Sequence, residues 1–188
     1  MDEYSLKLDK YLMPIVSNIG SPIILELGVE NGRSTKKFLE ICKKKNGKVF
    51  SVDINDCSNV TADENWQFYK TRDDNFEFIK SKIPGKIDVL FIDSLHEASH
   101  VKKLFYGYYP ILKNNGYIFI DDISHLPYLK NKERDNFYCE INNKETFELL
   151  ISIYSKNFEN FDLDFSFMSS GLAIIKKKMI KNFYLLIN

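Results

Sequence analysis

The chain has 188 residues, 44% of them hydrophobic, and its 26 Lys and Arg residues are balanced by 26 Asp and Glu residues. This length predicts a single domain, 1–188, with a sizeable buried core. The zero net charge excludes a general attraction to nucleic acid or to an anionic membrane surface. Three scattered cysteines favour a reducing, cytoplasmic setting, and no apolar run approaches the ~20 residues of a membrane span. The oligomeric state stays open.

Residues 1–20 are expected to form a helical segment. Apolar side chains from Leu6 to Ile19 recur at loosely helical spacing, and Pro14 interrupts the pattern. We expect one lid-like helix or two short ones.

The next stretch predicts a buried strand, a glycine turn and the start of a helix. Ile23–Leu27 is a short apolar run, and a helical pattern begins at Ser34. Gly28 and Gly32 lie in the turn, where the absence of a Cβ lets a ligand approach backbone N–H groups at the positive end of the helix. Their spacing, G-x-x-x-G, matches neither the dinucleotide fingerprint nor the phosphate loop.

Strands and helices alternate along the rest of the chain. Further strands are expected at 48–52, 66–69, 87–92, 117–120, 161–168 and 172–177. Helices are expected at about 76–83, 97–112 (closed by Asn114-Asn115-Gly116) and 144–158. The polar segment 123–143 between them is expected to be a substrate loop. This order predicts an α/β fold, a doubly wound, mostly parallel seven-stranded sheet with an antiparallel C-terminal hairpin.

Acidic residues directly follow the predicted strands. They are Asp53, Asp73 or Asp74, Asp93, and Asp121 with Asp122. In parallel sheets, ligands bind at the carboxyl ends of the strands. We therefore expect these carboxylates to lie around one site.

Four motifs together resemble one family. They are E-x-G-x-x-x-G-R-S-T at 26–35, S-V-D at 51–53, F-I-D-S-L-H at 91–96 and G-Y-I-F-I-D-D at 116–122. The set resembles the class I S-adenosylmethionine-dependent methyltransferases, which have a Rossmann-like fold. Within them it is most similar to the small catechol- and sugar-O-methyltransferase-like group. The resemblance implies S-adenosylmethionine as the cofactor.

The same resemblance assigns roles to the cofactor residues. Gly28 and Gly32 would let the chain pass close to the cofactor, and Glu26 and Ser34 would help to hold its methionine end. Asp53 would accept hydrogen bonds from both ribose hydroxyls, because a carboxylate can accept two donors at once. Asp73 or Asp74 would meet the adenine amino group, and Asp93 would lie beside the cofactor.

The expected reaction is methyl transfer to a hydroxyl of a small acceptor such as a sugar. A divalent ion, Mg²⁺ by preference, held by Asp93, Asp121 and Asp122 would orient the acceptor and lower its pKa. His125, three residues after Asp122, is the preferred general base, and His96 is the second candidate. The loop is expected to contact the acceptor through Tyr128, Lys130, Arg134 and Tyr138.

Two other functions remain open. Residues 96–100 spell H-E-A-S-H, which matches the zinc-peptidase motif H-E-x-x-H. That motif needs both histidines on one face within a helix, whereas the strand expected at 87–92 places His96 at the helix cap. The second alternative is a module that binds the cofactor but has lost turnover.

Overall fold

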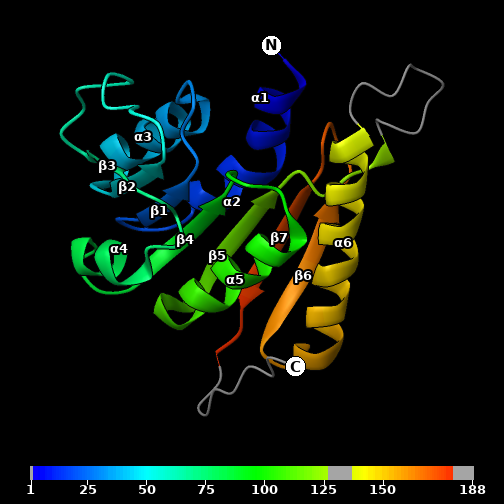
Figure 1. Ribbon diagram of the computed structural model, residues 1–188. Coiled ribbons are helices and arrows are strands. Elements are labelled where there is room, and N and C mark those ends of the chain that lie inside the picture. Colours follow the sequence, from blue (N-terminus) through cyan, green and yellow to red (C-terminus); the bar gives the residue numbers. More distant parts are fainter. Residues whose placement is uncertain (1, 127–136, 180–188) are drawn as a thin grey trace.

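The computed structural model describes residues 2–126 and 137–179, which form one mixed sheet between two layers of helices (Figure 1). The sheet has seven strands in the order β3-β2-β1-β4-β5-β7-β6. Their bounds are β1 Ile23–Leu27, β2 Lys48–Asp53, β3 Trp66–Lys70, β4 Ile87–Ile92, β5 Leu112–Asp121, β6 Phe161–Ser166 and β7 Leu172–Lys177. Strands β1 to β5 pair in parallel, whereas β7 is antiparallel to both β5 and β6. The predicted fold, including the antiparallel C-terminal hairpin, is confirmed.

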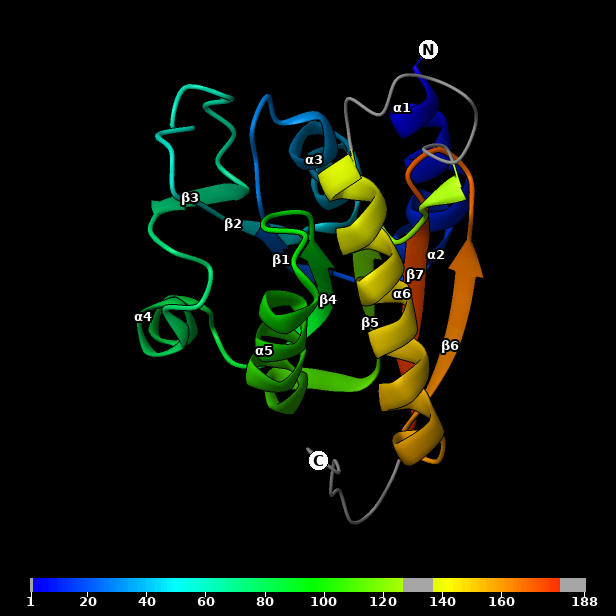
Figure 2. The same cartoon turned by 45° about the vertical axis from the view of Figure 1, so that its right-hand side comes forward.

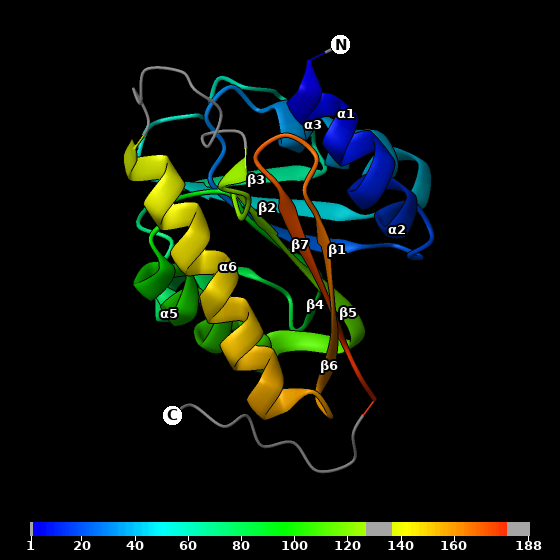
Figure 3. The same ribbon diagram turned by 90° about the vertical axis from the view of Figure 1, so that its right-hand side faces the viewer.

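The helices form two groups on opposite faces of the sheet (Figures 2 and 3). One group contains α1 Glu3–Lys7, the π-helical turn η1 Leu8–Leu12, α2 Met13–Ser17 and α3 Arg33–Lys45. The other contains α4 Phe76–Lys82, α5 Ala98–Tyr108 and α6 Phe137–Asn157. Successive strand residues point to opposite faces, so Ile24 packs with the first group and Leu25 with the second. In the part of the chain that the structure describes, no helix combines the length and the apolar character needed to cross a membrane.

The N-terminal segment is one continuous helical run from Glu3 to Ser17. Pro14 lies in the first turn of α2, directly after the π-helical turn η1. The side chains of Leu8, Leu12 and Val16 are fully buried in the core on this face of the sheet. The inner face of the segment is therefore part of the hydrophobic core, and its action as a lid stays a prediction.

The end of α5 differs from the prediction. The helix stops at Tyr108, and Pro110 lies in a short 3-10 helix, η2 Tyr109–Ile111. Strand β5 then begins at Leu112, so Asn114-Asn115-Gly116 lies within the strand and does not close the helix. Its register with β4 shifts there, and Asn115 adopts a positive φ, as in a β-bulge. The Asn114-Asn115-Gly116 pattern, which predicts the end of a helix, instead marks a bulge within β5.

The expected loop 123–143 is shorter than predicted because α6 begins at Phe137. Tyr128, Lys130 and Arg134 lie outside the described residues. Tyr138 is on the exposed side of α6, and its hydroxyl donates to Glu97 Oε1 at 2.8 Å. This contact joins the start of α6 to the segment that follows β4.

Candidate active site

A cavity of about 640 Å³ lies at the carboxyl ends of β1, β2, β4 and β5. Residues that follow these four strands line it, together with Tyr4 from α1 and Arg33 from α3. The volume lies within the range of roughly 300–1,000 Å³ that is typical of small-molecule sites. The cavity lies where the connections leave in opposite directions from β1 and β4, which is the usual ligand position in such sheets.

The turn between β1 and α3 requires glycine at two positions. Gly28 has a φ of +94°, and a Cβ on it would lie 1.9 Å from the Asp93 carbonyl oxygen. Gly32 has a φ of +69°, and a Cβ there would lie 2.1 Å from Val60 Cγ1. Gly28 lines the cavity, and because it has no side chain, this wall of the cavity consists of backbone atoms. A ligand could therefore approach the backbone closely here, as the sequence predicts.

Glu26 lies below this turn and is fully buried. Its carboxyl group accepts hydrogen bonds from Ser34 Oγ at 2.5 Å, Thr35 Oγ1 at 2.7 Å and Ser51 Oγ at 2.6 Å. Among the described residues, Ser34 lines the cavity and Glu26 does not. Glu26 therefore connects β1, β2 and α3 beneath the site, whereas direct contact with the cofactor was expected.

Glu26 should make the stability of the protein depend on pH. Burial raises its pKa from 4.5 to about 7. A carboxyl group that holds its proton more tightly when folded stabilises the fold below its unfolded pKa, and this contribution is lost as the pH rises from 4.5 to about 7. We expect Glu26→Gln, which stays neutral, to remove up to about 3 kcal/mol of that fall in the free energy of unfolding. Urea denaturation of both proteins from about pH 5 to about pH 8 tests this; parallel profiles would contradict it.

Asp53 lies at the end of β2 and lines the cavity as predicted. Its Oδ2 accepts the backbone N–H groups of Val29 at 2.9 Å and Glu30 at 3.2 Å, and its Oδ1 accepts that of Asn55 at 2.8 Å. Burial acts to raise the pKa of Asp53, but these donors outweigh it and hold the pKa below the usual range. The group is therefore a carboxylate at neutral pH.

The choice between Asp73 and Asp74 is decided by their neighbours. Asp73 lines the cavity, where it accepts Ser94 Oγ at 2.5 Å and lies 2.9 Å from His100 Nε2. Asp74 does not line it, because its carboxylate pairs with Arg72 and with Lys103. Side-chain hydrogen bonds from these two cations hold the pKa of Asp74 well below its usual range. Asp74 therefore belongs to a surface ion-pair network and is not part of the pocket.

The H-E-A-S-H segment does not build a zinc site. Glu97 is the N-cap of α5, so His96 precedes the helix and His100 lies within it. His100 faces Asp73, whereas His96 Nε2 lies 3.4 Å from Asp122 Oδ2 and 3.7 Å from Asp93 Oδ1. The two histidines have different partners, and the geometry that the peptidase motif needs is not formed.

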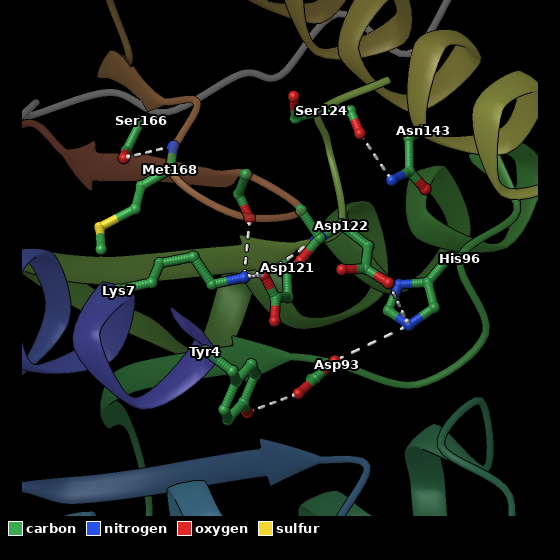
Figure 4. A network of polar contacts seen from close by, with 12 residues as sticks. Tyr4, Lys7, Asp93, His96, Asp121, Asp122, Ser124, Asn143, Ser166 and Met168 are labelled. Atoms are coloured by element: carbon green, nitrogen blue, oxygen red, sulfur yellow. Dashed lines mark hydrogen bonds and ion pairs between the residues drawn. The ribbon is translucent and has the colours of Figure 1, made fainter. Parts of the chain in front are cut away.

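The acids after β4 and β5 lie together at the other end of the cavity (Figure 4). The Tyr4 hydroxyl donates to Asp93 Oδ2 at 2.8 Å, and Nζ of Lys7 donates to Asp121 Oδ1. Burial raises the pKa of Asp121 to about 7, with the Asp93 charge adding to the rise and Lys7 opposing it. Burial likewise raises the pKa of Asp93 to about 6, and the hydrogen bond from Tyr4 opposes this.

These residues do not fit a divalent ion. Mg²⁺ needs oxygen ligands that converge on one point, without a cation of the protein among them. Here Lys7 lies against Asp121, and within residues 2–126 and 137–179 no three His, Cys, Asp or Glu side chains are placed to hold a metal. The magnesium site expected from Asp93, Asp121 and Asp122 does not match this arrangement, because the chain already supplies a positive charge there.

The two candidate bases lie in different places. His96 lines the cavity, with Asp122 beside its ring. His125 is not among the described residues that line the cavity, and its Nδ1 is buried without a hydrogen-bond partner there. The geometry therefore favours His96, although the sequence pattern favours His125.

Several lining residues were not singled out from the sequence. Ile54 and Leu95 line the cavity, and their side chains are 65% and 47% exposed. Ile54 directly follows Asp53 in a polar stretch, and an apolar residue at such a place is a signal that could have been used. Tyr4 also lines the cavity, and it carried no comparable signal because its partner Asp93 lies far along the chain. The same holds for Lys7, which pairs with Asp121 and does not line the cavity.

One comparison with known proteins places the chain in a family. The family model described as a methyltransferase domain matches residues 25–123, just over half of the chain. No curated protein matches it.

Several solved structures are similar in fold. A candidate caffeoyl-CoA O-methyltransferase from Staphylococcus aureus is 21% identical, with a TM-score of 0.69 and coverage of 94% of this chain and 84% of that one. An O-methyltransferase from Bacillus cereus in complex with S-adenosylhomocysteine is 15% identical, with a TM-score of 0.68 and coverage of 92% and 81%.

The mycinamycin-pathway methyltransferase MycE is also similar. In complex with Mg, S-adenosylhomocysteine and mycinamycin VI, it is 19% identical with a TM-score of 0.63, and coverage is 93% of this chain and 48% of that one. This chain thus spans about half the length of MycE, and at these identities the likeness shows the fold. With the family match and the strand-end site, it follows that the chain belongs to the class I S-adenosylmethionine-dependent methyltransferases.

Proposed function

We propose that the protein transfers a methyl group from S-adenosylmethionine to a hydroxyl of a small acceptor, with a sugar or a similar polyol as the acceptor class. One observation carries this proposal. Gly28, Asp53 and Asp73 line the same cavity as His96 and Asp122, so the residues proposed for the cofactor and the proposed base border one space. Structural neighbours that bind S-adenosylhomocysteine support the cofactor.

The cofactor would lie along the ends of β1 and β2. Asp53 would accept the ribose hydroxyls, and the exposed side chains of Ile54 and Leu95 would lie against the adenine ring. Asp73 lies at the same end of the cavity, beside Ser94. The methionine end would lie over Gly28, where the N-terminus of α3 and Arg33 favour a carboxylate.

In this arrangement His96 and Asp122 would lie at the end of the cavity where the acceptor binds. S-adenosylmethionine would supply the methyl group to the acceptor oxygen and would leave as S-adenosylhomocysteine. The hydroxyl proton passes to the imidazole ring of His96. Asp122 Oδ2, 3.4 Å from Nε2 of this ring, stabilises the imidazolium that forms. His96 is then the base, Asp122 its partner, and Asp93 a polar wall of the site.

The polarity of this wall supports the acceptor class. Asp93 and Asp122 are both partly exposed to the cavity, and carboxylates accept hydrogen bonds from hydroxyl groups. A polyol offers several such donors to the oxygen atoms of these carboxylates that Tyr4 and His96 leave open, whereas an apolar acceptor offers none. Small sugars and catechols, each offered with labelled cofactor, form the panel that separates polyols from planar phenols.

Calorimetric titration of S-adenosylhomocysteine into metal-stripped protein tests the cofactor site. We expect micromolar affinity, and we expect Asp53→Asn to weaken it by about 10- to 100-fold through the loss of a charged acceptor. Asp56→Asn is the control, because Asp56 lies close in the sequence but does not line the cavity. Absence of binding by the wild-type protein would sink the proposal. Binding without methylation of any acceptor in the panel would favour a module without turnover.

A further inference from the structure

Lys7 is a buried charge in a site that contains three carboxylates. Its side chain has an exposed fraction of 0%. Its Nζ donates to Asp121 Oδ1, to Ser170 Oγ at 2.9 Å and to the Gly171 carbonyl oxygen at 3.1 Å. These three acceptors match the three N–H donors of an ammonium group. Lysine is almost never fully buried unless it is paired, so the pairing here is specific.

Lys7 pairs with Asp121, one of the three carboxylates at the strand ends. Asp121 and Asp122 follow β5, and Asp93 follows β4, so their negative charges gather at one edge of the sheet (Figure 4). Carboxylates so close repel one another unless a positive charge lies among them. The ammonium group reaches Asp121 from α1, and Lys7 does not itself line the cavity.

Lys7 also acts on Asp122 through Asp121. The Oδ1 atom that accepts from Lys7 also accepts the backbone N–H of Asp122 at 2.9 Å. Asp122 has a φ of +58°, a conformation that costs energy for a residue other than glycine and needs support from its surroundings. The carboxylate of Asp122 then lies beside His96. Lys7, Asp121, Asp122 and His96 therefore form one continuous chain of contacts.

We propose that Lys7 supplies the positive charge of this site in place of a divalent ion, and that it positions Asp122 against His96, so that cofactor binding and methyl transfer need no metal. The second half of this inference rests on the proposed function; the first half concerns only the ion pair. MycE, which is similar in fold, was solved in complex with Mg. This chain would then differ from MycE in having a lysine where a metal ion would otherwise supply the charge. Lys7 is a positioning residue, since it touches neither ligand.

Titration with Mn²⁺ tests whether Lys7 takes the place of a divalent ion. Binding is followed by electron paramagnetic resonance, because the signal of free Mn²⁺ is lost when the ion binds. We expect no saturable binding to the wild-type protein up to about 1 mM. Lys7→Ala leaves the carboxylates without their cation and opens space beside them, so we expect it to bind Mn²⁺ and to gain several degrees in Tm when Mn²⁺ is added. Lys37→Ala is the matched control, because Lys37 pairs with Asp9 of the same helical run, away from the site. It should resemble the wild type.

The remaining outcomes are equally decisive. Saturable Mn²⁺ binding by the wild-type protein would contradict the inference that Lys7 replaces a divalent ion. The same inference would fail if the Lys7→Ala protein neither bound Mn²⁺ nor gained stability from it. If Lys7→Ala does not fold, the wild-type titration still decides.

For the positioning role, we expect Lys7→Met to lower kcat by at least about 10-fold and to leave KM for the cofactor unchanged. We expect the activity of the wild-type protein to be equal in EDTA and in Mg²⁺. Activity lost in EDTA and restored by Mg²⁺ contradicts the inference, whereas a wild type that binds no S-adenosylhomocysteine contradicts only the proposed function.

Discussion

Replacing His96 by Gln is expected to lower kcat by about 10²- to 10⁴-fold while leaving the affinity for S-adenosylhomocysteine near its wild-type value. Gln retains polar atoms of similar size but cannot accept the proton of the acceptor hydroxyl. The affinity should persist because the contacts proposed for the cofactor come from Gly28, Asp53 and the residues around them. Single-turnover methylation of the best acceptor, with calorimetry in parallel, measures both quantities.

His125→Gln provides the matched comparison. His125 is also a histidine that closely follows a strand, but it is not one of the described residues that line the cavity. We expect His125→Gln to change kcat by less than about 10-fold. The opposite ranking, with His125 essential and His96 dispensable, would restore the pattern-based assignment of the base and remove His96 from the mechanism. Asp122→Asn should lower kcat as well, because it removes the charge beside His96.

Replacing Gly28 by Ala is expected to destabilise the protein by about 3 kcal/mol or more and to weaken cofactor binding by at least about 100-fold. The new Cβ would lie 1.9 Å from the carbonyl oxygen of Asp93, which is backbone at the end of β4. Either the β1–α3 turn or the end of β4 must move, and both form walls of the cavity. Urea denaturation and calorimetry measure the two effects.

Gly85→Ala separates the steric clash from the backbone strain. Gly85 has a φ of +98°, close to that of Gly28, but a Cβ there would meet no atom within 4 Å. We expect a loss of about 1–2 kcal/mol, due to the positive φ alone, and unchanged cofactor affinity. If the two alanine variants lost equal stability and both bound the cofactor normally, the close approach of Gly28 to Asp93 would have no functional importance.

The N-terminal helical run has a larger part in this site than its position in the sequence suggests. The hydroxyl of Tyr4 donates to Asp93, and Lys7 pairs with Asp121, so one helix contacts the acids after two strands. Burial raises the pKa of Tyr4, which keeps this hydroxyl protonated as a donor. Leu8, Leu12 and Val16 hold the run in the core. The proposed acceptor site is therefore organised in part by residues that precede the family-matched region, 25–123.

The sequence by itself determined the order of the elements and the edge where the site lies. Alternating strands and helices predict a parallel sheet, and a residue that directly follows a strand must lie at its carboxyl end. Asp53, Asp73 and Asp93 therefore line the cavity as expected. These conclusions depend on local periodicity and chain direction, which neighbouring residues encode.

Only the tertiary structure decided which of the polar residues meet. Lys7 and Asp121 are separated by 114 positions, and nothing in the pattern around either residue specifies the other. The same holds for His96, which faces Asp122, and for Glu26, whose three hydroxyl donors draw it beneath the site. Whether a carboxylate binds a metal, a ligand or a lysine depends on which charge packing brings within a few ångströms, because electrostatic and hydrogen-bond energies fall steeply with distance. That choice is made by the packing of the helices on the sheet.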